Sequence, residues 1–426
     1  MTDSAVPAQG RACALPQPSL VVCGECDAVY QRPVLASRDV ARCRRCGAVL
    51  GRGHFLRADG QAALALASLV TFFIASLSPI VDLELQGVRT TATLWQATRL
   101  TWEAGEPGVA LLSAATAFVF PLAVILLRLW VLMPLALRPA AAVDMPRLVP
   151  ALRALHVLLR WSMVEVFMLG VLIAVVRSAG ATSIVLGPGL FAYAVLTVLL
   201  TALQASGLHG LWQMLRPEPA APTAPAAALR HCACCGLVSA VAADAGAAAC
   251  PRCGYTLHTR KPDSLQRTWA WLATAALLYV PANLLPVMTT QSVLGQGSHT
   301  LVGGIHELWV AGSWELAVIV FVASIAVPLL KMGALGLLAA CARQRSRWRQ
   351  VERARLYRLV ETVGHWSMLD VFVVVLLVGM VHFGIIATVA PEVGLLAFGA
   401  VVVATMLAAD AYDARLTWPD DDPTAR

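Results

Sequence analysis

The sequence predicts an all-α polytopic membrane protein with two parallel repeats of about four transmembrane helices, each preceded by a small cytosolic zinc ribbon. Three observations predict this. The chain of 426 residues is 58% hydrophobic and 13% charged, whereas soluble proteins average about 45–50% apolar and about 25% charged. One pair of C-x2-C motifs occurs in each half of the chain, and the halves resemble each other.

The apolar residues form eight long stretches, each of which we interpret as a membrane-spanning helix. The stretches are Ala62–Ile80, Val109–Leu137, Val164–Val176, Leu190–Leu203, Thr268–Val287, Trp314–Ala340, Trp366–Val389 and Gly394–Ala409. A transmembrane barrel would instead show alternating segments of about ten residues. Residues 1–22 lack the apolar run of a secretory signal, so we expect no cleaved leader.

The arginines predict the orientation in the membrane. They follow the second and sixth stretches, at Arg138, Arg147, Arg153 and Arg160 and at Arg343, Arg345, Arg347, Arg349, Arg353, Arg355 and Arg358. By the positive-inside rule these segments are cytoplasmic, and even helix numbers then place both ribbons and both termini in the cytoplasm. We assign the basic pI of about 9.0 to this topology and expect no nucleic-acid binding.

An internal repeat organises the chain. Residues 161–167 read W-S-M-V-E-V-F and residues 366–372 read W-S-M-L-D-V-F, while Pro121 recurs as Pro328. A Pro/Ala-rich stretch separates the halves and predicts a semi-rigid linker. The expected domains are 1–60 (tail and ribbon 1), 61–215 (repeat 1), 216–229 (linker), 230–262 (ribbon 2), 263–412 (repeat 2) and 413–426 (cytoplasmic tail). An even number of spans per half predicts parallel repeats rather than inverted ones.

Each ribbon is expected to hold one structural zinc ion. The ligands are Cys23, Cys26, Cys43 and Cys46 in the first and Cys232, Cys235, Cys250 and Cys253 in the second. The paired knuckles lie 16 and 14 residues apart, and four thiolates complete a tetrahedral zinc shell. Gly47, Gly236 and Gly254 follow the second cysteine of three knuckles, and Asp27 follows that of the fourth, so we expect positive φ at all four.

Other cysteine chemistry stays open at this point. The C-x2-C pairs could be redox-active or bind iron, although no βαβ context for a thioredoxin motif is present. Cys234 lies inside a knuckle and could replace a ligand, whereas Cys13 and Cys341 fall outside the pattern.

Ionisable residues inside the membrane mark a further candidate site, because their burial in lipid is costly. Lys331 lies 12 residues before Arg343, about 18 Å along a helix, and Asp370 on the next span is its expected partner. The candidate lipid or proton pathway comprises Lys331, Asp370, Ser367, Ser324, Thr405, Glu165 and Ser162. Val124 replaces the lysine in the first half, so we expect the polar centre in the second. These residues could instead only hold helices in register.

The loops after the first span of each half, residues 81–106 and 288–313, contain Trp95, Trp102 and Trp309. We expect short interfacial helices there. Their tryptophans would anchor the chain at the interface or form a docking surface for a periplasmic partner.

The duplicated C-x2-C ribbons, the two W-S-M motifs and the prolines that end the first spans, Pro79 and Pro286, resemble those of the paraquat-inducible protein A family over nearly the whole chain. The resemblance implies a multi-pass protein of the bacterial inner membrane that moves phospholipids between membranes and supports envelope integrity. It also implies a periplasm-spanning MCE-domain partner. By this resemblance, Lys331, Ser367, Asp370 and Thr405 belong to an intramembrane network for lipid handling.

Two other functions compete with lipid transport, namely a membrane redox protein that uses the C-x2-C thiols and a non-transporting anchor or scaffold. We expect no enzyme, because the chain shows no nucleophile and base constellation and no dinucleotide fingerprint. It also shows no G-x-x-x-x-G-K-[ST] motif for nucleotide hydrolysis.

Overall fold

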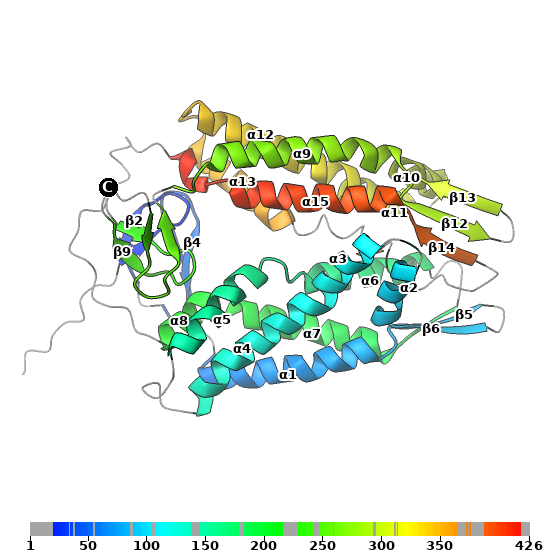
Figure 1. The fold of residues 1–426 in the computed structure, drawn as a ribbon, viewed down its shortest axis with the longest axis horizontal. Helices are drawn as coiled ribbons and strands as arrows, with labels where there is room; N and C mark the ends of the chain where they lie inside the picture. The colour runs from blue at the N-terminus through cyan, green and yellow to red at the C-terminus, as the bar shows by residue number, and fades with distance from the viewer. Residues whose placement is uncertain are drawn as a thin grey trace, which may run out of the picture.

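The structure is a computed structural model of the chain. It describes residues 20–33, 35–36, 39–53, 56–85, 88–103, 105, 107–137, 145–178, 183–215, 229–241, 247–258, 260–292, 295–310, 312, 314–364, 372–373, 375 and 387–418. Figure 1 shows two helical halves side by side, with small strand-rich modules at one end and longer hairpins at the other. We call residues 58–215 the first half and residues 264–418 the second.

The described helices of the two halves follow one another in a similar order. Those of the first half are α1 Ala58–Leu77, α2 Leu94–Glu103, α3 Pro107–Ala114, α4 Phe120–Leu137, α5 Met145–Leu158, α6 Val164–Ser178, α7 Pro188–Ala205 and α8 Leu208–Leu215. Those of the second half are α9 Ser264–Leu284, α10 Leu301–Val310, α11 Trp314–Phe321, α12 Val327–Arg343, α13 Gln350–Gly364 and α15 Val393–Ala411. In the first half α1 packs on α4 and α7, and in the second α9 packs along α15.

Within the described residues, five helices are long and apolar enough to cross a membrane: Ala58–Leu77, Pro107–Leu137, Pro188–Ala205, Ala317–Arg343 and Val393–Ala411. They coincide with five of the eight predicted stretches. Residues 164–176 lie in α6, which has 15 residues and is shorter than a span. Residues 268–287 lie largely in α9, a helix of 21 residues with lower hydrophobicity. The predicted stretch 366–389 lies almost wholly outside the described residues.

A π-helical turn interrupts the second span of each half, at Ala115–Val119 and at Val322–Ala326. Pro121 and Pro328 follow these turns by two residues. Proline lacks a backbone N–H and its ring clashes with the carbonyl four residues earlier. A wider turn accommodates this, and such bulges are frequent at functional sites.

A three-stranded antiparallel sheet extends from the far end of each half (Figure 1). The first contains β5 Val81–Leu85, β6 Val88–Ala92 and β7 Ser183–Leu186, and the second contains β12 Met288–Ser292, β13 Gly295–His299 and β14 Ala387–Pro391. The central strand directly follows the first long helix of its half. The sequence analysis predicted the short helices α2 and α10 in these loops but missed the hairpins that precede them.

The cysteine motifs form two modules of paired hairpins, which we call module 1 (residues 20–53) and module 2 (residues 229–258). Their strands are β1 Leu20–Val22, β2 Val29–Gln31, β3 Val40–Arg42 and β4 Val49–Arg52, then β8 Leu229–His231, β9 Val238–Ala240, β10 Ala247–Ala249 and β11 Thr256–His258. The modules contact each other through the buried side chains of Val22, Leu229 and Val238. Both modules lie at the same end of the two helical halves.

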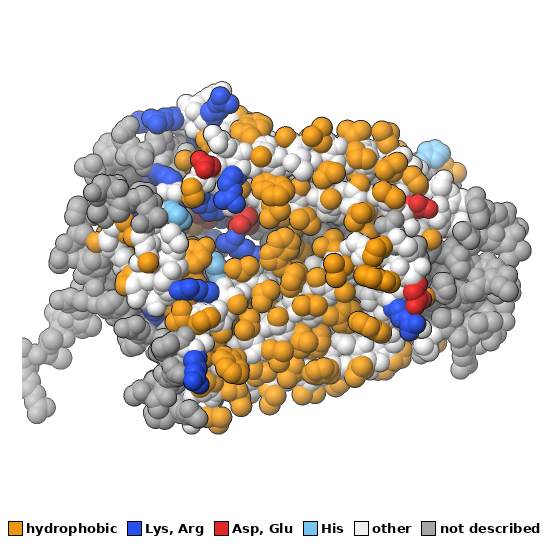
Figure 2. All heavy atoms as spheres, viewed as in Figure 1, with side chains coloured by type: hydrophobic (Ala, Val, Ile, Leu, Met, Phe, Trp, Pro, Cys, Tyr) orange, Lys and Arg blue, Asp and Glu red, His pale blue; other side chains and the backbone are white. Residues whose placement is uncertain are grey.

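Exposed apolar side chains cover the middle of the molecule in a broad band (Figure 2). Most of the basic side chains visible in this view lie at the end of this band that faces the modules, whereas acidic side chains lie at both ends. This distribution is that of a membrane protein, in which lipid-facing surface is apolar and charge concentrates at the edge.

Candidate functional site

Each module brings four cysteine sulfurs together. The Sγ atoms of Cys23, Cys26, Cys43 and Cys46 lie within 4.8 Å of one another, as do those of Cys232, Cys235, Cys250 and Cys253, and all eight residues are buried. The Sγ atoms of Cys23 and Cys46 are 3.5 Å apart in module 1, and those of Cys232 and Cys253 are 3.5 Å apart in module 2. A tetrahedral zinc site with Zn–S bonds of about 2.3 Å has sulfurs about 3.8 Å apart. The donor sets therefore fit a metal ion.

The knuckle geometry confirms the expected positive φ values, which are 56° at Asp27, 79° at Gly47, 72° at Gly236 and 66° at Gly254. In each knuckle the amide of this residue donates to the carbonyl of the first cysteine, as Gly254 N does to Cys250 O at 2.7 Å. The left-handed residue closes the turn that brings both sulfurs to the same side.

In each module the pKa of one thiol is lowered, while the pKa values of two thiols that are hydrogen-bonded to it are raised. Hydrogen bonds from Cys23 and Cys26 lower the pKa of the Cys46 thiol, and those from Cys232 and Cys235 lower that of Cys250. The thiolate is the form that binds metal. Cys234 is buried but lies outside the group of four sulfurs in module 2. Cys341 is half-buried on α12, and Cys13 lies outside the described residues.

The modules dock crosswise on the helical halves. Arg358 of α13, in the second half, donates to the carbonyl oxygen of Cys46 in module 1 at 2.8 Å and pairs with Glu25 at 2.5 Å. Arg153 of α5, in the first half, donates to the carbonyl oxygen of Cys253 in module 2. Both arginines stand eight residues before the tryptophan of a W-S-M motif, so the two contacts are equivalent in the repeat.

A second pair of contacts follows the same crossed pattern. The guanidinium of Arg45 in module 1 lies 4.3 Å from the ring centroid of Trp418 in the second half. The guanidinium of Arg252 in module 2 lies 5.6 Å from that of Trp212 in the first half. Each arginine immediately precedes the fourth cysteine of its module. Stacking of a guanidinium on an indole ring is favourable at this range.

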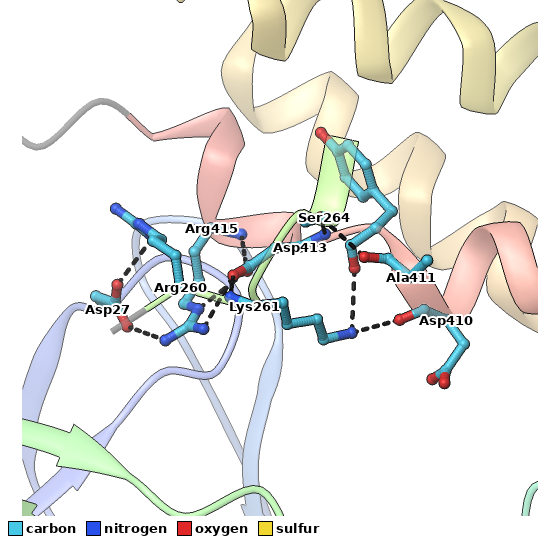
Figure 3. A network of polar contacts seen from close by, with 9 residues as sticks. Asp27, Arg260, Lys261, Ser264, Asp410, Ala411, Asp413 and Arg415 are labelled. Carbon is cyan, nitrogen blue, oxygen red and sulfur yellow. Dashed lines mark hydrogen bonds and ion pairs between the residues drawn. The ribbon is translucent and has the colours of Figure 1, made fainter. Parts of the chain in front are cut away.

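A polar network ties module 1 to the end of α15 (Figure 3). Asp413 is 3% exposed and accepts hydrogen bonds from Arg415 and from the amide of Lys261. Arg415 and Arg260 also pair with Asp27 of module 1, at 3.8 Å and 3.1 Å. The segment after module 2 is thereby held between module 1 and the second half.

A cavity of ≈ 90 Å³ lies between the two halves, near the charged edge of the apolar band. Its described lining includes Arg160 and Trp161 of the first half and Lys331, Glu361 and Asp410 of the second. Lys331 is 3% exposed, and its Nζ lies 3.5 Å from the carbonyl oxygen of Gly364. An amine so buried in a membrane protein marks a ligand pathway or a paired structural contact.

The other predicted polar residues lie elsewhere. Ser324 is buried at the π-helical turn and lines a second cavity, of ≈ 60 Å³, toward the hairpin end. Thr405 is buried on α15 and donates to Val402 O at 2.8 Å. Glu165 accepts a hydrogen bond from Thr201 on α7 at 2.8 Å, and the hydroxyl of Ser162 has no partner among the described residues. Ser367 and Asp370 lie outside the described residues.

The sequence analysis missed one membrane cation. Arg128 lies on α4, one helical turn after Val124, and is 1% exposed. It donates to the carbonyl oxygen of Leu203 at 2.5 Å, near the end of α7. Its Nε and Nη2 atoms have no hydrogen-bond partner within the described residues. Each half thus carries a buried cation on its second span, displaced by one turn. A search of the second span for any basic residue, rather than for the exact repeat of Lys331, would have found it.

A comparison with known protein families matches the two halves of the chain separately. The family model described as "Paraquat-inducible protein A" matches residues 59–216 and 265–421. The chain is 34% identical to "Intermembrane transport protein PqiA" of Escherichia coli, over 93% of this chain and 95% of that protein. It is 30% identical to a "Probable intermembrane transport protein" of Haemophilus influenzae, over 94% of this chain and 95% of that one.

A third relative is "Lipophilic envelope-spanning tunnel protein A" of Escherichia coli, 29% identical over 95% of this chain and 92% of that protein. No solved structure matches the chain.

Proposed function

Because this chain belongs to the paraquat-inducible protein A family, we propose that it is an inner-membrane component of a lipid transport system. In this system it passes phospholipids between the inner membrane and a periplasm-spanning MCE-domain partner, and so supports envelope integrity. Relatives named as intermembrane transport and envelope-spanning tunnel proteins support the proposal. The role is transfer without catalysis.

The observation that carries the proposal is the cavity that contains Lys331. It opens between the halves, where charged side chains adjoin the apolar band, and Lys331 is buried in its wall. A phospholipid that leaves the bilayer must keep its phosphate solvated by protein groups. An ammonium held in an apolar wall supplies a strong charge-assisted hydrogen bond to such a phosphate.

We propose that the chain crosses the membrane eight times, with the two halves in parallel orientation and the modules in the cytoplasm. The five long apolar helices, and the gathering of basic residues at the module end, support this orientation. Each module holds one structural zinc ion, which fixes a fold too small to be stable on its own core. The domain division is the one expected from the sequence.

Photochemical labelling tests the transport proposal. The full chain is reconstituted in nanodiscs that contain a phospholipid with a photoactivatable group beside the phosphate, and labelled peptides are identified by mass spectrometry. We expect labelling around Lys331, and we expect Lys331→Ala to reduce it about tenfold, since a hydrogen bond to a charged group contributes about 1.5–3 kcal/mol.

Leu330→Ala on the lipid-facing side, where Leu330 is 71% exposed, is the matched control and should leave the labelling of the cavity unchanged. Equal labelling of the cavity in wild type and Lys331→Ala, with both proteins folded, would remove the phosphate-binding role of Lys331.

A further inference from the structure

The loop between α12 and α13, residues 344–349, carries a cluster of basic side chains together with the end of α12. Four arginines are exposed here, namely Arg343, Arg345, Arg347 and Arg349. Of these four, only Arg349 has an ion-pair partner among the described residues, which is Glu352 at 3.3 Å. The loop therefore presents guanidinium groups that no described carboxylate pairs with.

This loop lies at the level of the lipid headgroups. Leu330 and Leu337 on α12 are exposed apolar side chains of the kind that face lipid. Arg343 follows Leu337 by six residues, about 9 Å along a helix. Each headgroup layer is about 5–8 Å thick, so the loop begins within it. Trp348 in the loop is 57% exposed, and exposed tryptophans are enriched at this interface.

Two of the arginines adopt a backbone conformation that is unfavourable for them. The φ angle is 48° at Arg345 and 44° at Arg349. The two other non-glycine residues with positive φ in the described chain are aspartates, Asp27 and Asp263, and aspartate tolerates this region. In arginine the Cβ atom crowds the following carbonyl oxygen. Strain of this kind is a reason to look for a function of the side chain.

Arg345 occupies the position at which glycine commonly ends a helix. The amide of Ser346 donates to the carbonyl oxygen of Cys341, and the amide of Arg345 donates to that of Ala342, both at 3.1 Å. These two bonds form a Schellman motif, whose left-handed residue is usually glycine. Glycine would therefore suit the turn better than arginine. A positive charge for membrane orientation could stand at any neighbouring position, so orientation alone does not explain Arg345.

The loop is held in shape from within the protein. The buried guanidinium of Arg353 on α13 donates to the carbonyl oxygen of Ser346. The amide of Trp348 donates to Ser346 Oγ at 3.3 Å, and the guanidinium of Arg349 lies 5.3 Å from the centroid of the Trp348 ring. A preformed surface of this kind loses less conformational freedom when a ligand binds.

We propose that the α12–α13 loop is a docking site for anionic phospholipid headgroups, such as phosphatidylglycerol, at the surface of the bilayer. The lipid phosphate accepts charge-assisted hydrogen bonds from Arg345 and Arg347. Trp348 packs beside the glycerol and the upper acyl chains. A zwitterionic headgroup brings its own cation next to the same arginines, whereas an anionic headgroup does not, so the surface favours the anionic lipid.

The site is separate from the cavity that contains Lys331, so the inference goes beyond the proposed function and does not depend on it. A bound lipid would fix the corner from which α13 starts. The same helix carries Arg358, which contacts module 1, so the docked lipid supports the position of that module relative to the membrane.

A lipid titration tests the site. The purified full-length protein in neutral detergent is titrated with phosphatidylglycerol or with phosphatidylcholine of the same acyl chains, and bound lipids are counted by native mass spectrometry. We expect phosphatidylglycerol to bind at least about fivefold more tightly, because a basic residue near a lipid surface contributes about this factor. Lys331→Ala should keep the preference, since the cavity is not part of the site.

Arg345→Gly is the decisive variant, because it keeps the left-handed turn and removes the charge. We expect phosphatidylglycerol to bind about fivefold more weakly, with a melting temperature equal to or above that of the wild type. Arg267→Gln, which removes an exposed charge from the first turn of α9, is the matched control and should keep the wild-type affinity. Equal affinity of the wild type for both lipids overturns the proposal, as does equal affinity of the two variants for phosphatidylglycerol.

A second occupant of the loop is tested with a chain that ends at Trp418. Residues 420–422 are three aspartates, and Thr417 shortly before them accepts a hydrogen bond from Gln350 at the start of α13 at 3.1 Å. Preference for phosphatidylglycerol in the full chain supports lipid docking. If only the shortened chain shows the preference, the acidic segment covers the loop and the lipid site is overturned for the full chain.

Discussion

The Nη2 atom of Arg358 lies 2.8 Å from the carbonyl oxygen of Cys46, which precedes it by 312 positions. Arg153 makes the equivalent contact with Cys253. Module 1 is therefore held by the half of the chain that it does not precede, and module 2 is held by the first half. A metal ion in either module would then stabilise a contact between distant parts of the sequence. The metal clusters therefore help to hold the two halves together.

We expect Arg358→Ala to loosen module 1 alone. The substitution removes the hydrogen bond to Cys46 and the ion pair with Glu25. Both groups are partly exposed, so we expect a loss at the lower end of about 1.5–3 kcal/mol and metal release about tenfold faster. The measurement is cysteine alkylation under chelator, read by peptide mass spectrometry. Cys23, Cys26, Cys43 and Cys46 should become reactive first.

Arg153→Ala should show the opposite pattern, with faster alkylation in module 2 and an unchanged rate in module 1. Arg355→Ala, an exposed position on the same helix as Arg358, is the control and should leave both rates unchanged. If Arg358→Ala accelerated both modules equally, the crossed contacts would not stabilise individual clusters.

We expect the purified protein to contain two zinc ions per chain, one in each group of four sulfurs. Cys46→Ser should leave one, because a three-thiolate site binds zinc more weakly. Cys234→Ser should leave two, since Cys234 lies outside the group in module 2. Elemental analysis of the three proteins is the measurement, and a value near one for Cys234→Ser would make Cys234 a ligand.

Local chemistry explains what the sequence could predict. The four sulfurs of each cluster and the left-handed turn at Asp27 follow from spacing within a few residues, as do the apolar helices. The long-range contacts could not be predicted in this way, because nothing near Arg358 in the sequence identifies Cys46 as its acceptor. The hairpins at residues 81–92 and 288–299 were missed because they are short and polar and because their third strands come about a hundred residues later.

Arg128 was missed in the sequence for a different reason. The repeat predicts an equivalent for Lys331 only at the same position, and Val124 occupies that position. A cation one helical turn away can still face the interior of the helical bundle, since residues four apart lie on the same face of a helix. A comparison of equivalent positions in the two halves therefore missed Arg128, whereas its burial in the structure identifies it directly.

We expect Gly189→Ala and Gly394→Ala to destabilise the junction between the last long helix and the end of the first helix in each half. A Cβ atom at Gly189 would lie 2.6 Å from the oxygen of Ser78, and one at Gly394 would lie 2.4 Å from the oxygen of Pro286. These are backbone atoms, and the amide of Gly394 also donates to Pro286 O at 3.0 Å. Overpacking of this kind costs about 1–3 kcal/mol.

The apparent melting temperature in detergent should therefore fall by several degrees for both glycine variants. Gly336→Ala on α12 is the control, because a Cβ there meets no atom within 4 Å, and alanine favours helix. Melting temperatures of Gly189→Ala and Gly394→Ala that equal or exceed that of Gly336→Ala would contradict the close approach.

Mild acid should destabilise the contact between α5 and module 2. The ring of His156, outside the candidate spans, lies edge-on to Tyr255 with centroids 6.1 Å apart. Burial, followed by the nearby charges of Arg160 and His209, lowers the pKa of His156 from 6.5 to about 4, and Asp410 offsets this only in part. The unfolded chain takes up this proton near pH 6.5, whereas the folded protein takes it up only near pH 4.

The unfolded state therefore binds more protons between these values, so the free energy of unfolding decreases as the pH falls from about 6.5 to about 4. The contribution of His156 is constant above and below this window. We expect His156→Phe, which keeps an aromatic ring against Tyr255, to lose less melting temperature between pH 7.5 and pH 5 than the wild type. His306→Gln, at an exposed position on α10, should follow the wild type. An identical pH profile for His156→Phe and wild type would assign the acid sensitivity to other groups.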